Sequence, residues 1–102
     1  MILRECLHYW LRRYGEPFQV GTQTHWGVFF QPSAGLLRWH FSPEALTELP
    51  RPLWAVAVAP HVNLPLNTTL TWRGGSYRAL RQIEFRLGTA TVYRVAILEP
   101  IV

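Results

Sequence analysis

Residues 68–98, TTLTWRGGSYRALRQIEFRLGTATVYRVAIL, have the pattern of a three-stranded antiparallel meander. Gly74, Gly75 and Gly88 stand where tight hairpin turns need the positive φ angles that glycine adopts at little cost. Apolar residues recur at every second position between these turns, which is typical of strands with one face toward a core. We expect that face to carry Leu70, Trp72, Tyr77, Ala79, Arg81, Ile83, Phe85, Thr91, Tyr93, Val95 and Ile97.

Upstream of the meander, the sequence predicts helices at two places. Apolar residues at helical spacing predict an N-terminal helix over 2–14, which Gly15 and Pro17 end. A helix of about one turn is expected to begin at Ser42-Pro43-Glu44, because Ser is a good N-cap and Pro suits the first helical position.

Four further segments predict strands, because their apolar residues alternate or form short continuous runs. These segments are 18–20, 23–31, 37–41 and 53–59. Together with the meander, they predict a single mainly β domain over 1–102, in which the N-terminal α-helix precedes the strands of 17–98. The expected fold is a small antiparallel β-barrel or sandwich of about six strands.

Composition limits the possible functions. All ten basic residues are Arg and all six acidic residues are Glu, so any site that needs Asp is excluded. The formal charge of +4 permits contact with nucleic acid or an acidic partner, although the arginines form no run. Cys6 is the one cysteine, so no internal disulfide is expected, and charged residues interrupt any signal-peptide core near the N-terminus. We expect a soluble protein made in a cytoplasm.

The sequence contains no recognisable catalytic or metal-binding constellation. Cys6 lies on the apolar stripe of the first helix, where a cysteine is usually a small hydrophobe. The four histidines are dispersed over different elements without ligand spacing, and the glutamates are separated from one another. We therefore predict no enzyme activity, no cofactor and no metal site.

Two kinds of binding remain open. In the meander, arginines interleave with Trp72, Tyr77 and Phe85, as in small barrels that bind single-stranded nucleic acid by stacking and phosphate contact. The same alternation also suits a solvated sheet face with aromatics in the core, and the parity of the aromatics favours this interpretation. Five tryptophans are many for so small a domain to bury, and Trp and Arg dominate contact hot spots, which favours a protein–protein surface.

The order of several short motifs resembles a known family. The N-terminal helix ends in Arg13-Tyr14-Gly15-Glu16-Pro17, and a strand then carries Val28-Phe29-Phe30-Gln31-Pro32. The meander contains Thr68-x-x-x-Trp72-Arg73-Gly74-Gly75-x-Tyr77 and ends in Tyr93-Arg94-Val95-Ala96-Ile97-Leu98. Over most of the chain, this order resembles the small structural proteins encoded between the portal and tail genes of tailed phages and prophages. These include head–tail connector, head-completion and tail-completion proteins.

The resemblance implies a β-barrel protomer that assembles into a ring on the portal–adaptor stack or at the end of the tail, around the channel through which DNA passes. The implied partners are other copies of the chain in a hexamer or dodecamer, the portal or adaptor, tail proteins and packaged DNA. The protein is then expected at the head–tail junction of the virion, after synthesis in the bacterial host cytoplasm. The apolar segment 53–60 departs from the more polar middle strand or loop expected of the family.

The candidate subunit-interface residues are apolar or aromatic: Leu3, Leu7, Trp10, Leu11, Trp39 and Trp54. The candidate residues facing DNA or the lumen are Arg73, Arg78 and Arg86. The alternative function is a nucleic-acid-binding module that uses the Arg-rich meander, and a small enzyme with a site shared between subunits is a distant third. Salt separates the first two, because binding dominated by phosphate contacts weakens steeply with ionic strength, whereas an aromatic interface tolerates salt.

Overall fold

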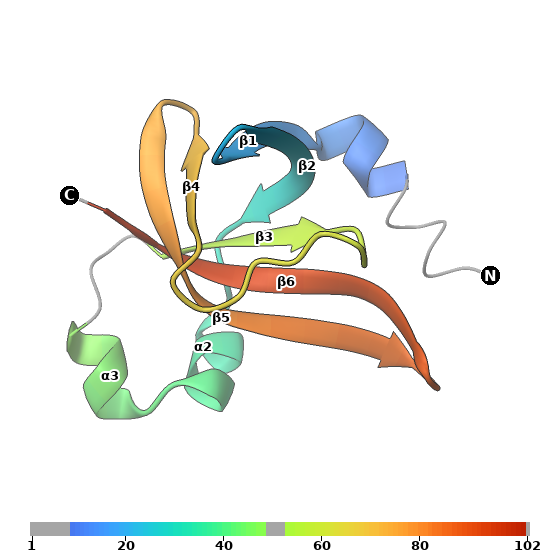
Figure 1. The fold of residues 1–102 in the computed structure, drawn as a ribbon. Coiled ribbons are helices and arrows are strands. Elements are labelled where there is room, and N and C mark those ends of the chain that lie inside the picture. The colour runs from blue at the N-terminus through green and yellow to red at the C-terminus, as the bar shows by residue number, and fades with distance from the viewer. Residues whose placement is uncertain (1–8, 49–52, 102) are drawn as a thin grey trace.

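The structure, a computed structural model, describes residues 9–48 and 53–101. Its centre is a closed antiparallel barrel with the strand order β1–β2–β3–β6–β5–β4 (Figure 1). The mainly β prediction is confirmed, and the barrel is the form that the sheet takes. The strands are β1 (Glu16–Val20), β2 (Gln23–Phe30), β3 (Trp54–Val58), β4 (Thr69–Trp72), β5 (Gly75–Leu87) and β6 (Ala90–Pro100).

The predicted meander is confirmed as β4, β5 and β6, with both turns where they were expected, but in the first turn Arg73 has the positive φ that was expected at Gly75. Trp72 pairs with Gly75, so the first turn has Arg73 and Gly74 as its two central residues, with φ angles of 51° and 77°. Leu87 pairs with Ala90, and Gly88 in the second turn has a φ of 65°. Positive φ at these central positions matches the twist of the flanking strands.

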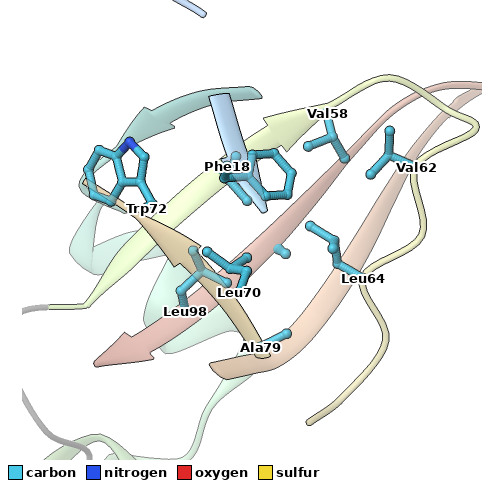
Figure 2. Close-up of a cluster of buried hydrophobic side chains, with 10 residues drawn as sticks. Phe18, Val58, Val62, Leu64, Leu70, Trp72, Ala79 and Leu98 are labelled. Carbon is cyan, nitrogen blue, oxygen red and sulfur yellow. The ribbon is translucent and has the colours of Figure 1, made fainter. Parts of the chain in front are cut away.

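The barrel interior is filled by one cluster of buried side chains (Figure 2). The loop between β3 and β4 adds two residues to this core, because Val62 and Leu64 are buried there although the sequence predicted only a loop. At the β1–β2 hairpin, Gly27 faces inward, and a Cβ at this position would lie 2.5 Å from Val56 Cγ2. The core residues are Phe18, Val56, Val58, Val62, Leu64, Leu70, Trp72, Ala79, Ala96 and Leu98.

Two short helices, α2 (Ala34–His40) and α3 (Pro43–Glu48), cover a second cluster outside the barrel, built on Leu37, Leu53 and Ile97. The prediction of a strand over 37–41 is therefore wrong. Ser33 caps α2, since its hydroxyl accepts a hydrogen bond from the Leu36 amide at 3.1 Å. The alternation of this segment was misleading, because Leu37 on α2 and Phe41, the C-cap of this helix, pack into the same outer cluster.

The helix predicted to begin at Ser42 is confirmed. The Ser42 hydroxyl accepts a hydrogen bond from the Ala45 amide at 3.2 Å, which satisfies one of the free amides at the start of α3. Residues 49–52, which follow α3, lie outside the described residues. At the N-terminus, residues 9–14 are helical, and the remainder of the predicted helix over 2–14 also lies outside them.

A β-bulge at Leu80 divides β5 into two parts whose side chains alternate in opposite phase. Ala79 pairs with Leu98 and Arg81 with Ile97, so Leu80 is an extra residue on β5. Before the bulge, Ala79 faces the barrel interior. After it, Arg81 is on the outer face, opposite Ile97. The prediction that one face carries 77, 79, 81, 83 and 85 is therefore wrong beyond residue 79.

The strand β6 buries both of its faces where it crosses the barrel. Leu98 packs into the interior, whereas Ile97 packs into the outer cluster beneath α2, and both are 0% exposed. Val95 and Ile97 are buried as predicted, but Ile97 does not face the barrel interior. A pattern of alternating apolar residues predicts one buried face only. It therefore does not predict that β6 is buried on both faces, which happens because α2 covers the outer one.

Candidate interaction surfaces

The helix over 9–14 presents aromatic rings to solvent. Tyr9, Trp10 and Tyr14 are 52%, 47% and 50% exposed. Trp10 stacks on Tyr14 with ring centroids 5.1 Å apart, so the rings form one connected surface. Leu11 is half-buried, and the exposed Arg12 and Arg13 line a shallow depression with Tyr9. We call Tyr9, Trp10 and Tyr14 the helix surface.

Of the predicted interface residues on this helix, Trp10 is available for contact and Leu11 is partly available. The apolar stripe that includes Trp10 and Tyr14 does not bury these two rings against the barrel of its own chain. Leu3 and Leu7 lie outside the described residues, so their assignment stays a prediction.

The two remaining predicted tryptophans have opposite environments. Trp39, on α2, is 84% exposed, the highest value among the exposed large hydrophobic residues of the described part of the chain. Trp54, at the start of β3, is partly buried against the barrel core, where its ring meets Trp72 edge-on at a centroid distance of 5.0 Å. Trp39 is therefore free to contact a partner, whereas Trp54 mainly packs within its own chain.

Sequence reasoning did not select Trp26, which is 56% exposed on β2. The neighbouring Gly27 could have indicated the exposure of Trp26, because a glycine inside a strand often marks the face that another strand approaches closely. Side chains alternate along a strand, so Trp26 then points to the opposite, outer face. Trp26 pairs with Pro17, which closely follows the helix over 9–14 in the chain. The backbone of Trp26 therefore pairs with the segment that follows this helix.

The far half of the β5–β6 hairpin extends beyond the barrel (Figure 1). The pairing of β3 with β6 ends at Arg94, and the pairing of β4 with β5 ends at Arg78. Residues 85–93, which we call the arm, therefore have only each other as strand partners in the described part of the chain. The ring of Phe85 stacks on Tyr93 at 4.6 Å, and Leu87 is 53% exposed.

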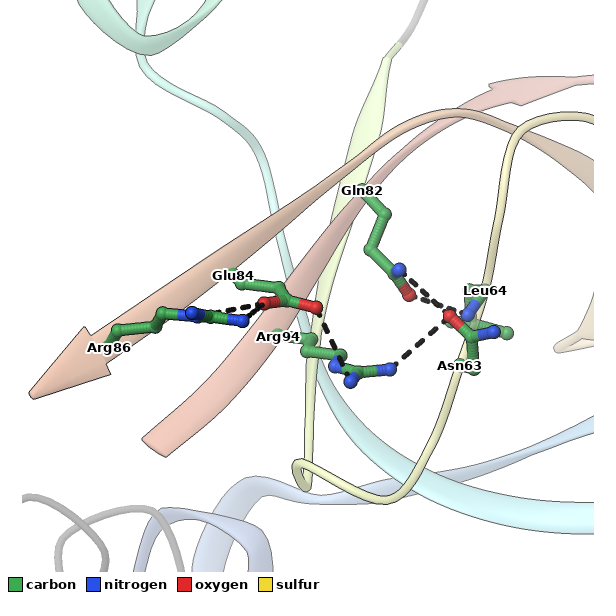
Figure 3. A network of polar contacts seen from close by, with 6 residues as sticks. All are labelled: Asn63, Leu64, Gln82, Glu84, Arg86 and Arg94. Carbon is green, nitrogen blue, oxygen red and sulfur yellow. Dashed lines mark hydrogen bonds and ion pairs between the residues drawn. The ribbon is translucent and has the colours of Figure 1, made fainter. Parts of the chain in front are cut away.

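Polar contacts attach the base of the arm to the loop before β4 (Figure 3). Glu84 forms ion pairs with Arg86, at 3.0 Å, and with Arg94, at 3.3 Å. Arg94 and Gln82 both donate to Asn63 Oδ1, at 3.2 and 2.8 Å. Because Glu84 is shared by Arg86 and Arg94, one of the two positive charges in this network is balanced and the other is not.

The three arginines assigned to DNA or the lumen are each paired with a glutamate. Arg73 Nε lies 2.6 Å from Glu16 Oε1, and its guanidinium lies 4.9 Å from the Trp72 ring centroid. Arg78 Nε donates to Glu99 Oε1 at 2.7 Å. Arg86 pairs with Glu84, as described above. The side chains of Arg73, Arg78 and Arg86 nevertheless remain 66%, 49% and 59% exposed.

Arg73, Arg78 and Arg86 pair with three different glutamates at three different places in the fold. Arg73 belongs to the β4–β5 turn, where its ion pair with Glu16 helps to join β4 to β1 at the position that closes the barrel. Arg86 belongs to the arm. Arg78 holds Glu99, which is only 5% exposed, at the β5–β6 pairing. Each of these arginines therefore has an ion-pair partner within its own chain.

Within residues 9–48 and 53–101, no group of three or more His, Cys, Asp or Glu side chains is close enough to hold a metal ion. Over the same residues, no helix is both long enough and apolar enough to cross a membrane. No protein-family model matches the chain, and no curated protein or solved structure matches it either.

Proposed function

We propose that the protein is a structural component of a tailed phage or phage-derived particle, and that it forms a ring at the head–tail junction. The ring joins the portal or adaptor to the tail around the DNA channel. The proposal combines the motif order in the sequence with one structural observation. Three of the five tryptophans, Trp10, Trp26 and Trp39, are exposed on three different elements.

The exposed tryptophans support an assembly function because the barrel does not need them for its own core. That core contains Trp72 and draws on Trp54, and it is closed by side chains from the strands and the β3–β4 loop. Each exposed indole leaves a large apolar area in water, which burial against a partner would remove. Trp is also the residue type most enriched among interface hot spots.

The arm supports the same proposal from the backbone side. Two strands that project without a third partner are only marginally stable in water, and their unpaired edges are ready to accept another strand or a packed surface. The exposed side chains of Phe85 and Leu87 lie on this projection. A neighbouring protein in a stacked assembly would supply the missing cover.

Nucleic-acid binding through the meander remains the second candidate, and the exposure of Arg73, Arg78 and Arg86 favours it. Their glutamate partners weaken the case, because a phosphate must compete with a carboxylate already in contact with the guanidinium. The aromatic residue Trp72, proposed for base stacking, is 3% exposed and stacks on Phe29 inside the barrel instead.

The deciding experiment is the solution mass of the purified protein, alone and mixed with the products of its neighbouring genes, at low and high salt. A ring, or a salt-tolerant complex with a portal- or tail-type neighbour, is the expected result. A persistent monomer that binds nucleic acid at low salt and releases it at high salt would reject the assembly function, because affinity based on phosphate contacts falls steeply with ionic strength.

The charge-removing variant Arg78→Gln/Arg86→Gln tests the second candidate directly, because it removes two positive charges without placing a second carboxylate beside the buried Glu99. In the assembly function, this variant assembles as the unchanged protein does, provided that its thermal unfolding shows a folded barrel. Loss of nucleic-acid binding in the variant, together with unchanged assembly, would assign the two behaviours to separate surfaces.

A further inference from the structure

The strand β5 has a free edge where it leaves the barrel. β4 pairs with β5 only as far as Arg78, and beyond the bulge the side chain of Gln82 is bound to the loop before β4. Over residues 83–87, the edge of β5 that faces away from β6 has no strand partner among the residues that the structure describes. Figure 1 shows this stretch in the projecting part of the hairpin. Such an edge offers backbone N–H and C=O groups to another strand.

The five residues of this edge, Ile83-Glu84-Phe85-Arg86-Leu87, are symmetrical in chemical type. An aromatic residue stands at the centre, residues of opposite charge flank it, and an aliphatic residue stands at each end. Because side chains alternate along a strand, the three apolar side chains share one face and the two charged ones share the other. The apolar face is the outer one, where Ile83 packs against the outer cluster.

This symmetry favours one register between two antiparallel copies of the edge. Pairing about Phe85 places Glu84 of each copy opposite Arg86 of the other. The same register places Ile83 opposite Leu87, with the two Phe85 rings adjacent. Directly opposed residues of opposite charge, and directly opposed apolar residues, each stabilise a sheet. Pairing about Glu84 or about Arg86 would instead set two like charges against each other, which is destabilising.

The ion pairs that Glu84 makes within its own chain are compatible with this register (Figure 3). Glu84 pairs with Arg86 at 3.0 Å and with Arg94 at 3.3 Å, and the side chains of Glu84 and Arg86 remain 33% and 59% exposed. Across a twofold axis at Phe85, each Glu84 keeps its own Arg86 and gains the Arg86 of the other copy. Glutamates and arginines then alternate on this face, whereas Arg94 lies one strand further from the axis, on β6.

From these observations we infer that the protein forms a twofold dimer, in which residues 83–87 pair antiparallel with the same residues of a second copy of this chain. The contact is isologous, because the same segment serves on both sides. It joins two marginal two-stranded projections into one four-stranded sheet, which is a more stable unit in water. Since the two strands run in opposite directions, each barrel lies beyond the tip of the other arm.

The dimer goes beyond the proposed function, because it concerns two copies outside a particle. A neighbouring protein that covers the arm would displace the second copy. The paired segment is short, so we expect a weak dimer that dissociates at low micromolar concentrations and forms as the concentration approaches about 1 mM. Sedimentation of the full chain over this range measures the dissociation constant.

The first test uses two charge variants with complementary defects. In the proposed register, Glu84→Arg sets arginines against arginines, and Arg86→Glu sets glutamates against glutamates. Each variant alone is expected to dimerise at least about tenfold more weakly than the unchanged protein. An equimolar mixture restores both oppositely charged pairs, so it is expected to form a 1:1 heterodimer with an affinity near that of the unchanged protein. Native mass spectrometry distinguishes the two chains by mass.

The second test places a cysteine on the twofold axis, with Cys6→Ser as the background. Residue 85 lies opposite itself, and directly opposed residues have Cα atoms about 4.5 to 5.5 Å apart, within reach of a disulfide. Leu87→Cys is the matched control, because the two copies of residue 87 are four positions apart along the strands, about 13 Å, which is too far. With oxidised glutathione as the oxidant, Phe85→Cys is expected to cross-link at least about tenfold faster than the control.

The control is a stringent one, because Leu87 is more exposed than Phe85, 53% against 36%, so random collision would favour cross-linking at residue 87. Faster cross-linking of Leu87→Cys would therefore overturn the inference. An unchanged protein that stays monomeric at about 1 mM would also overturn it.

The charge variants give two further results that would reject the register. One is dimerisation of both variants at the affinity of the unchanged protein. The other is a mixture that forms no heterodimer although thermal unfolding shows that both variants are folded. If either variant is unfolded, the cross-linking rates decide, because those variants keep both charged residues. The proposed ring is tested separately, by mixing the protein with the products of its neighbouring genes, so it stands or falls independently of the dimer.

Discussion

The β5–β6 hairpin is one pair of strands with two unlike halves. In the half that crosses the barrel, Ala79, Ile97 and Leu98 are all 0% exposed. In the arm, Phe85 and Leu87 are 36% and 53% exposed, although the two strands are still paired with each other. The comparison shows that burial in a hairpin depends on its neighbours in space more than on its own alternation.

The neighbours of the two halves explain the difference. The half in the barrel is flanked by β4 and β3, packs inward on the core and is covered outside by α2 and α3. The arm relies on the stack of Phe85 on Tyr93 and on the polar network around Glu84. Stability is therefore expected to reside in the barrel half, and the arm is left as an accessible surface.

The sharpest comparison uses the same substitution in the two halves. Leu98→Ala is expected to lower the free energy of unfolding by about 2 to 5 kcal/mol, because it removes a fully buried side chain and leaves a cavity. Leu87→Ala in the arm is expected to change it by less than about 0.5 kcal/mol. Denaturant unfolding of both variants measures the difference, and equal losses would show that the arm is buried in solution.

A second comparison concerns the two glutamates that pair with arginines. Glu99 is 5% exposed, and Glu99→Gln is expected to cost about 1 to 2 kcal/mol, because the exposed side of Arg78 lets water replace part of the lost interaction. Glu84→Gln in the arm network is expected to cost less than about 1 kcal/mol, since its groups are more solvated. Denaturant unfolding measures both losses of unfolding free energy. A larger loss for Glu84→Gln than for Glu99→Gln would show that the network at the arm contributes more to stability than the buried pair does.

The smallest effect concerns the aromatic stack of the arm. A double-mutant cycle with Phe85→Ala, Tyr93→Ala and the double variant is expected to give a coupling energy near 0.5 kcal/mol, at about the low end for aromatic pairs because Phe85 is partly exposed. The cycle is measured by thermal and denaturant unfolding. A coupling of zero would mean that these rings do not stay stacked in solution.

Local signals in the sequence were sufficient for most of the secondary structure. The glycines at 74 and 88 marked both turns of the meander, and Ser42-Pro43 marked the start of α3. These predictions succeeded because each depends on a few adjacent residues whose φ angles or caps are restricted. The segment 37–41 failed because five residues are too few to separate a period of two from a helical face when only one side is buried.

The candidate interface was predictable in part. The sequence selected Trp10 and Trp39 as candidate contact residues, and both are exposed, but it also selected Trp54, which packs on Trp72. It also did not predict that Arg73, Arg78 and Arg86 are held by glutamates. Arg73 and Glu16 lie 57 residues apart in the chain and meet only because β4 closes against β1.

The sequence by itself determined the β class, the positions of the turns and the abundance of aromatic and arginine residues. These properties follow from composition, from alternation and from residues that restrict their own backbone. Tertiary structure alone decided which face β5 buries after Leu80, which tryptophans remain in water and which arginines pair with a glutamate. Those outcomes depend on which segments lie side by side once the barrel closes, and no local pattern encodes that pairing.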